Sequence, residues 1–465
     1  MHLSTLYRVG QSFMRRDLVA ILAAVGVVCA TAGCKDLTNA TLPAGTANPS
    51  AYNNAAGAVS MRNNTVSAFA KSFPAYVVSS GILTDEYHAI NIGLYRSCDT
   101  RILVTGMECD TQIGVPYTML QGVRNNAHLA IAALNTYLPD SSAAMRGELY
   151  AVAGYTELLM ADFFCSGVPL STLDYQGDFT YAPGSTTVQL YRAAIAQFDS
   201  AAAIAHDSAS IVSFAHVGKG RALLALGVYD SAALAVAGVP TDFKYRVVAK
   251  VGGLESFDNS PYIFSSDITL ADSEGVNGIR FVTDNDPRSG YVPASGTSLQ
   301  RINPTKYNAL GYSELTVADG IEARLIEAEV TLRSGNAAAW LDDLNALRTT
   351  CTDVIGCPTP APAGSGGIGG LPPLSDPGAN GRLDLMFSER AYWLFLTGHR
   401  QGDLRRRIRE DGLTDAQLYP TGLYSQVVAP ADVRPPIFYG SDVAVPIPPT
   451  ELANPLFRGC INHDA

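Results

Sequence analysis

The chain has 465 residues, 47% of them hydrophobic, and a formal net charge of −11. A hydrophobic share of this size supports a buried core and excludes a globally disordered chain. The acidic balance argues against a surface that binds nucleic acid or an anionic membrane. Only 16% of the residues are charged, so uncharged hydrogen-bonding side chains must supply much of the surface polarity, which suits neutral ligands.

The N-terminal residues have the pattern of an export signal. Two arginines precede an apolar run of fifteen residues, Leu18 to Ala32. A helix of that length spans roughly 22 Å, which is short of the about 30 Å that a bilayer core requires. We therefore expect residues 1–33 to be a signal peptide that starts at Met1 or at Met14.

Cys34 follows three small residues, Thr31-Ala32-Gly33, at the end of this run. The sequence resembles a bacterial lipobox, in which the cysteine is acylated and becomes the mature N-terminus, although Thr31 stands where a leucine is usual. An ordinary secretory cleavage, with Cys34 in a structural role, is the alternative. Lipidation would make residues 34–55 a lipidated N-terminus and tether.

Six cysteines lie beyond this expected anchor. An even number of cysteines in an exported chain indicates disulfide bonds. The expected pairs close short loops, Cys98–Cys109 and Cys351–Cys357, leaving Cys165 and Cys460 free to form a long-range pair.

The rest of the chain predicts a mostly α fold built from tetratricopeptide-like helical hairpins. A polar helix is expected from residue 50 towards Pro74, followed by a loop-like segment over residues 81–112. Residues 117–230 then carry two pairs of helices, because apolar residues recur at helical spacing. Short connections, such as the one at Pro139, make the members of a pair antiparallel, although the strict repeat consensus is absent.

Residues 243–312 differ from these helical segments. Short β-branched runs, such as residues 279–282, alternate there with clusters of glycine, asparagine and aspartate. We expect an irregular, loop-rich insert that carries small strands. A later stretch rich in glycine and proline, residues 358–377, is expected to form an exposed loop.

The segment between residues 319 and 407 has the clearest pattern. Asp319 is a good N-cap with Glu322 three residues later, and a glycine–asparagine turn separates the two helices that follow. This pattern predicts a helical hairpin. The helix over residues 385–396 is apolar on every side at its centre, so Trp393 and Phe395 are expected to be buried.

Several short blocks in the C-terminal half resemble the SusD/RagB family, and they occur in the order typical of that family. They are Asp286-Pro287-Arg288, Lys306-Tyr307, Leu325-Ile326-Glu327-Ala328-Glu329 with Leu332-Arg333, Leu344-Asn345 with Leu347-Arg348, Glu389-Arg390, Gly398-His399-Arg400, Asp403-Leu404-Arg405-Arg406, and Val445-Pro446-Ile447-Pro448 with Glu451 and Asn454-Pro455. The chain departs from the family at Trp393 and Thr397, where acidic residues are usual, so it resembles a divergent member. The resemblance implies one helical domain over residues 56–465, with the C-terminal family blocks in residues 319–455.

The resemblance also implies a function. Proteins of this family are outer-membrane lipoproteins that face the cell exterior and bind nutrients, most often oligosaccharides. They cap a TonB-dependent barrel transporter and deliver the nutrient to it without bond chemistry. A peptide-binding subunit of such a transporter is one alternative, and a structural helical-repeat adaptor that binds only proteins is another.

We expect no enzyme activity, no cofactor and no metal site from the sequence motifs. No two histidines stand four residues apart, as in the zincin helix, and no Cys-x-x-Cys occurs. Gly218-Lys219-Gly220 lacks the first glycine of a P-loop, because Ser213 occupies that position. Four charged residues near the apolar helix are interpreted as structural ion pairs and caps: Glu389, Arg390, Asp403 and Arg405.

Ligand-binding candidates are aromatic and polar residues in segments predicted to be loops. A sugar presents an apolar C–H face and a rim of hydroxyls, so its site needs exposed aromatic rings beside carboxylates, amides or arginines. The residues that fit are Asp85, Tyr87, Tyr95, Arg96 and Tyr291, together with Tyr175, Phe179 and Tyr181. An ordinary packing role is the alternative for each of them.

Overall fold

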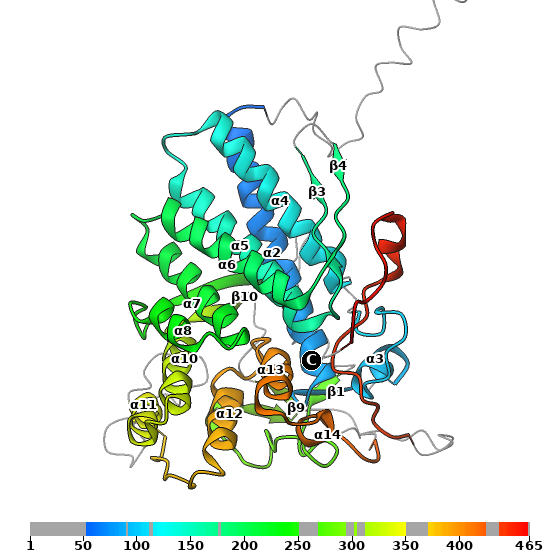
Figure 1. Cartoon of the computed structure of the whole chain (residues 1–465), viewed down its shortest axis with the longest axis vertical. Coiled ribbons are helices and arrows are strands. Elements are labelled where there is room, and N and C mark those ends of the chain that lie inside the picture. Colours follow the sequence, from blue (N-terminus) through cyan, green and yellow to red (C-terminus); the bar gives the residue numbers. More distant parts are fainter. Residues whose placement is uncertain are drawn as a thin grey trace, which may run out of the picture. The chain divides into compact units, whose positions relative to one another are not determined.

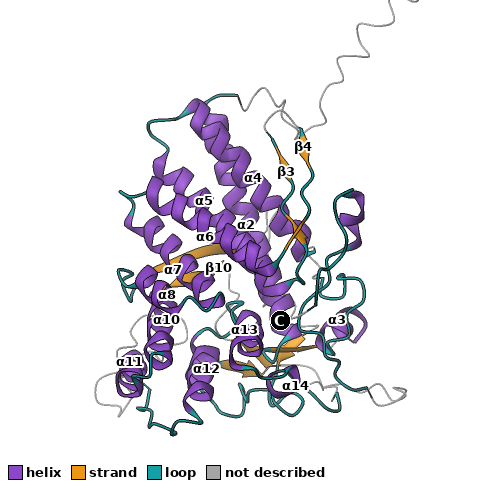
Figure 2. Ribbon diagram, viewed as in Figure 1, coloured by secondary structure: helices purple, strands orange, loops and turns teal. Residues whose placement is uncertain are grey.

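The computed structural model confirms a mostly helical chain with small strands (Figure 1, Figure 2). It describes residues 53–89, 92–110, 115–174, 178–250, 268–293, 302–304, 312–349, 371–424 and 437–463. Contacts between residues group Asn54–Ala465 into one unit. Cys34, Tyr175, Cys351 and Cys357 lie outside the described residues.

The first half of this unit is an array of helices that lie side by side (Figure 1). The helices are α2 (Ala55–Leu83), α4 (Pro116–Tyr137), α5 (Ala143–Phe163), α6 (Thr187–Ile204), α7 (Ala209–Ala225) and α8 (Tyr229–Val236). From α4 to α8, each helix packs against the next one along the chain, and α2 packs against α4. The hairpins predicted from hydrophobic spacing are therefore present, and α2 extends the array.

The helix α2 does not end near Pro74, and in this respect the prediction is wrong. It continues through the proline to Leu83 and is buried from Ser72 onwards. A proline inside a helix costs about 3 kcal/mol, and the burial of apolar residues in the turns that follow it, such as Tyr76 and Ile82, offsets this cost. The segment expected to be a loop contains a strand, β1 (Tyr87–Ala89), and a helix, α3 (Ile92–Asp99).

Gly154 of α5 and Gly218 of α7 both face the ring of Phe198 in α6. A Cβ atom at Gly154 would lie 2.8 Å from this ring, and one at Gly218 would lie 2.4 Å from it. Side chains do not approach each other so closely, so glycine at both positions allows the three helices to pack around Phe198. The segment Gly218-Lys219-Gly220 thus lies inside α7. This agrees with the interpretation that it is not a phosphate-binding loop.

The second half of the unit holds the remaining helices. They are α10 (Gly320–Arg333), α11 (Ala337–Thr349), α12 (Arg382–Trp393), α13 (Arg400–Asp411) and α14 (Asp415–Leu418). The predicted hairpin is α10 and α11, and Asp319 caps α10 by accepting a hydrogen bond from the Glu322 amide at 2.8 Å. Trp340, Met386 and Trp393 are buried together where α10, α11 and α12 meet.

The strands pair two by two in antiparallel ribbons. They are β1 with β7 (Ile268–Leu270), β2 (Val168–Pro169) with β5 (Gly184–Ser185), β3 (Thr172–Leu173) with β4 (Phe179–Thr180), β6 (Lys244–Lys250) with β10 (Tyr312–Asp319), and β8 (Tyr291–Pro293) with β9 (Ile302–Pro304). The insert predicted to carry small strands contains β6 to β9 and a short 3-10 helix, Pro287–Ser289; a second 3-10 helix, Pro449–Ala453, lies near the C-terminus.

Two disulfide bonds join described residues. Cys98 and Cys109 are bonded, which is the expected short loop, and Cys165 is bonded to Cys460 across 295 residues of sequence. The second bond holds the C-terminal tail against the end of α5, where the amide of Ile461 also donates to the carbonyl of Ser166 at 2.6 Å.

No helix within the described ranges is both long enough and apolar enough to span a bilayer.

Phe395 provides a test of the core. Its side chain is fully buried, and its ring lies 4.6 Å from that of Phe281. We expect Phe395→Ala to lower the free energy of unfolding by about 3–5 kcal/mol, because the truncation leaves a cavity. Phe179→Ala is the matched control, since half of the Phe179 side chain is exposed, and its melting temperature should stay close to that of the wild type. Equal thermal melts for the two variants would contradict this assignment of the core.

Candidate functional site

Asp85, Tyr87 and Tyr95 do not form a surface site, which corrects the prediction for these three residues. Each is at most 1% exposed. The Arg400 guanidinium donates to both carboxylate oxygens of Asp85, at 2.7 and 2.8 Å. The expectation was wrong because these residues meet partners far away in sequence: Asp85 pairs with Arg400 of α13, and Tyr87 lies in β1, which pairs with β7.

Arg96 and Tyr291 are half-buried, and Tyr291 packs against the edge of the main hydrophobic core. Neither takes part in an aromatic contact between described residues. The structure therefore does not unite the described candidates in one site. Tyr175 lies outside the described residues, and the two candidates that remain, Phe179 and Tyr181, lie at the β3–β4 hairpin.

Phe179 and Tyr181 form an exposed aromatic pair at the β3–β4 hairpin. Their side chains are 51% and 43% exposed, and their ring centroids lie 4.8 Å apart in an edge-to-face arrangement. Large apolar rings are costly to leave in water, so a pair of them side by side on a hairpin marks a surface suited to contact with another molecule. Asp178 and Thr180 beside them are also exposed and offer polar atoms to a ligand.

The base of this hairpin is fixed to neighbouring elements. Gln121 of α4 donates to the carbonyl of Pro169 at 2.7 Å, and Arg124 of the same helix donates to the carbonyl of Ser171. Asn454, near the C-terminus, donates to the carbonyl of Ala182 at 2.9 Å. The two rings are therefore presented by an anchored ribbon, which lowers the entropic cost of binding.

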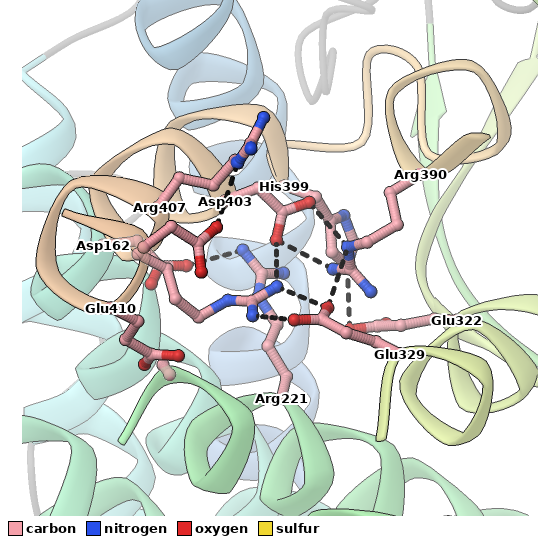
Figure 3. A network of polar contacts seen from close by, with 12 residues as sticks. Asp162, Arg221, Glu322, Glu329, Arg390, His399, Asp403, Arg407 and Glu410 are labelled. Atoms are coloured by element: carbon pink, nitrogen blue, oxygen red, sulfur yellow. Dashed lines mark hydrogen bonds and ion pairs between the residues drawn. The ribbon is translucent and has the colours of Figure 1, made fainter. Parts of the chain in front are cut away.

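A buried network of ion pairs joins α10, α12 and α13 (Figure 3). Arg390 donates to both oxygens of Asp403, at 2.8 and 2.9 Å. Arg406 donates to Glu329 at 2.8 Å and to Asp403 at 3.1 Å. All four side chains are less than 10% exposed, so they hold helices together and are not open to a ligand.

The same network reaches the helical array. Arg221 of α7 donates to Asp162 of α5 at 2.6 Å and to the carbonyl of Gly398 at 2.9 Å. His399 pairs with Glu322 at 2.9 Å (Figure 3).

The other two residues interpreted as structural have similar partners. Glu389 accepts from Arg288 at 2.7 Å and from Arg348 at 2.6 Å. Arg405 donates to the carbonyl oxygens of Ala161 and Asp162 at 2.8 and 2.9 Å. The structure thus agrees with the interpretation of Glu389, Arg390, Asp403 and Arg405 as ion pairs and caps.

The charge state of this network follows from its geometry. Burial favours the neutral form of Asp403, but Arg390 and Arg406 outweigh this effect and hold its pKa well below the usual value. The pKa of Glu329 is lowered in the same way, by Arg406 against the effect of burial. Both carboxylates are therefore ionised in the folded protein at neutral pH.

A surface cavity of about 510 Å³ lies between α8, α10 and the start of α12. Its two arginines are already paired: Arg333 with Glu329 and Asp411, and Arg382 with Asp376. The only aromatic residue in its lining is Tyr229, whose hydroxyl donates to Glu410. The cavity offers no ring face comparable to the Phe179–Tyr181 pair.

A second polar cluster is buried where β1, α3 and β7 meet. His88 Nδ1 lies 3.1 Å from Glu274 Oε1 and 3.3 Å from Asp99 Oδ2. Two phenols complete the cluster, since Tyr424 donates to Asp99 at 2.5 Å and Tyr439 donates to Glu274 at 2.7 Å. We refer to these five residues as the His88 cluster.

The carboxylates of the His88 cluster have opposite pKa shifts. Burial and the charge of Asp99 raise the pKa of Glu274 well above the usual value. The pKa of Asp99 is lowered, because His88 outweighs the effect of burial, and the pKa of His88 is raised against burial by Asp99 and Glu274. Sequence reasoning did not find this cluster because its members come from separate segments and follow no motif spacing.

Comparisons with known proteins define the fold. No family model matches the sequence, and no curated protein matches it either. The structure is similar to a SusD-like protein from Bacteroides fragilis, with a TM-score of 0.62 and 12% identity, covering 90% of this chain and 98% of that one. The fold is therefore that of the SusD-like proteins, as the sequence blocks predict.

Two further structures have the same fold. A SusD-like carbohydrate binding protein from Bacteroides vulgatus matches with a TM-score of 0.57 and 12% identity, covering 87% of this chain and 97% of that one. A protein described as a laminarin binding SusD-like protein matches with a TM-score of 0.58 and 13% identity, covering 88% of this chain and 99% of that one. The TM-scores show a common fold, and identities at this level leave the ligand of this chain open.

Asp403→Asn tests the ion-pair network. Loss of the carboxylate leaves the buried charge of Arg390 uncompensated, so the free energy of unfolding at neutral pH should fall by about 3–5 kcal/mol. Asp199→Asn is the matched control, because Asp199 pairs with Lys219 at the surface. This variant should lower the free energy of unfolding by less than about 1 kcal/mol. Chemical denaturation of both variants measures the difference.

The same variant has a predicted pH dependence. The pKa of Asp403 is lower in the folded state, so its contribution to stability is present above the unfolded pKa of about 4 and is lost as the pH falls below it. Between about pH 6 and about pH 3 the wild type should lose stability more steeply than Asp403→Asn. Parallel curves of stability against pH would show that this carboxylate is not held ionised by its arginines.

Proposed function

We propose that this protein is an outer-membrane lipoprotein that binds oligosaccharides and delivers them to a TonB-dependent barrel transporter. Binding and transfer require no bond chemistry. The observation that carries the proposal is the exposed pair of Phe179 and Tyr181 on an anchored hairpin. Ring faces of this kind match the C–H face of a sugar, and exposed polar groups beside them match its hydroxyls.

The fold and the charge distribution support the same proposal. Structures with this fold include proteins described as carbohydrate binding and as laminarin binding. The carboxylates of the ion-pair network, Glu329, Glu389 and Asp403, are each held by arginines. Catalytic carboxylates must reach a substrate and change protonation state, so this pattern favours a binding protein over a hydrolase.

The aromatic pair is tested by ligand titration. We expect the wild-type protein to bind laminarin or another neutral glycan in a calorimetric screen, and Phe179→Ala and Tyr181→Ala each to weaken that binding by about tenfold. This loss corresponds to ~1.4 kcal/mol, the scale of a well-formed contact with an aromatic ring. Phe438→Ala is the matched control, since Phe438 is 58% exposed, and its affinity should equal that of the wild type.

The same screen separates the alternatives. Binding of peptides but not glycans would replace the proposed ligand by a peptide, and binding of neither would favour a helical-repeat adaptor. Glycan binding that is unchanged in both hairpin variants would place the site elsewhere.

The membrane anchor is a second part of the proposal, and it depends on the sequence around Cys34. In a host without a matching transporter, the wild type should fractionate with membranes and its N-terminal peptide should carry acyl chains by mass spectrometry. Cys34→Ala should move the protein into the soluble fraction, because stable anchoring then lacks its lipid. Membrane retention of the variant, or an unmodified Cys34 in the wild type, would contradict lipid anchoring.

A further inference from the structure

The His88 cluster has the donor set of a metal site. His88, Asp99 and Glu274 are 4%, 1% and 5% exposed, and one potential ligand atom from each lies within 4.8 Å of the others. Imidazole and carboxylate groups together suit zinc and related divalent transition metals better than they suit calcium. The three side chains come from β1, the end of α3 and the turn after β7, so an ion here would connect three segments.

The spacing between the ligand atoms is compatible with a tetrahedral ion. Zinc binds imidazole nitrogen and carboxylate oxygen at roughly 2.0–2.2 Å, which places neighbouring ligands of a tetrahedron about 3.3–3.5 Å apart. The distances from His88 Nδ1 to Glu274 and to Asp99 are 3.1 and 3.3 Å. Asp99 and Glu274 also have ligand atoms within 4.8 Å of each other, so a rearrangement of these side chains could admit an ion.

A cation can also satisfy the charge balance. Two buried carboxylates share one histidine, and if both carboxylates ionise around it, the set carries a net negative charge away from water. Burial of an uncompensated charge is costly. A divalent cation bound to two carboxylates and a neutral imidazole would make the set neutral.

Three donors hold the carboxylates in place. Asp99 Oδ2 accepts from Tyr424 and from the backbone amide of Ala89, at 2.5 and 2.9 Å, and Glu274 Oε1 accepts from Tyr439 at 2.7 Å. Hydrogen bonds of this kind orient metal ligands and tune their affinity.

A separate observation points to a missing partner. Asp99 Oδ1, Glu274 Oε2 and His88 Nε2 are shielded from solvent, and none of them has a hydrogen-bond partner within the described part of the chain. Buried polar atoms without partners are rare in folded proteins. The oxygens nearest His88 Nδ1 already accept these hydrogen bonds, so an ion would either share them with their donors or bind the second, unpartnered oxygen of each carboxylate.

We propose that His88, Asp99 and Glu274 bind a divalent transition metal ion, with Zn²⁺ as the preferred ion. The ion would take its fourth ligand from water, and Tyr424 and Tyr439 would act as hydrogen-bond donors to the carboxylates. Its role would be structural, because it would connect β1, α3 and β7 with the C-terminal segment that carries the two tyrosines. This proposal is independent of the glycan-binding function.

The test uses the full mature protein, first stripped of metal with a chelator. Titration with Zn²⁺ should give a single bound ion per chain and a higher melting temperature. Binding of Co²⁺ should give the visible absorption of a tetrahedral ion with nitrogen and oxygen ligands. Calcium at the same concentration should produce neither effect.

Two conservative variants locate the ion. Glu274→Gln keeps the shape of the side chain and should weaken Zn²⁺ binding by about 100-fold or more, whereas Tyr439→Phe removes one orienting donor and should weaken it by about tenfold. His206→Ala is the matched control, because His206 is an exposed histidine, and it should bind as the wild type does. Circular dichroism in chelator confirms that each variant is folded before it is titrated.

Two results would overturn the proposal. One is a folded wild-type protein that binds neither Zn²⁺ nor Co²⁺ in a stoichiometric amount, and the other is a Glu274→Gln variant that binds both ions as well as the wild type does. If no ion binds and Glu274→Gln is more stable than the wild type above neutral pH, the cluster is held together by a shared proton and no metal site exists.

Discussion

The guanidinium of Arg406 lies in the protein interior between Glu329 and Asp403, and the arrangement of the helices depends on this contact. The sequence of α13, rich in arginine, would suit a surface helix, yet residues 400, 401 and 403–407 are all buried. They can be buried because α2, α5, α10 and α12, or the turns beside them, supply matching carboxylates and carbonyl oxygens. A buried ion pair contributes little net stability compared with apolar packing. We infer that its main effect here is to allow only one register between these helices.

Local sequence patterns were sufficient to predict the helices, but they did not predict which of the connecting segments are buried. Hydrophobic spacing and the Asp319 cap predict the hairpins correctly, because both signals act within a few turns of the chain. Asp85 and Tyr87 were placed on the surface because their neighbours in sequence are polar. Their burial depends on Arg400 and on the pairing of β1 with β7, and neither partner can be identified from the residues around them.

The two candidate sites differ in how far the sequence could reveal them. Phe179 and Tyr181 were recognisable as loop aromatics, but their exposure and their edge-to-face contact are properties of the folded hairpin. The His88 cluster takes its residues from segments that are as far apart as His88 and Tyr439. No spacing rule connects such positions, so only the folded chain shows that they meet.

The bond between Cys165 and Cys460 has a consequence for the order of events during biosynthesis. Synthesis proceeds from the N-terminus, so Cys165 is made long before its partner, whereas Cys98 and Cys109 are made almost together. Cys351 and Cys357 also emerge before Cys460, and either can react with Cys165 first. Disulfide exchange requires an attacking thiolate, so a premature bond to Cys165 can be corrected only while a free thiol remains to attack it. A chain in which such a bond persisted would lack the link that holds its C-terminal tail against the end of α5.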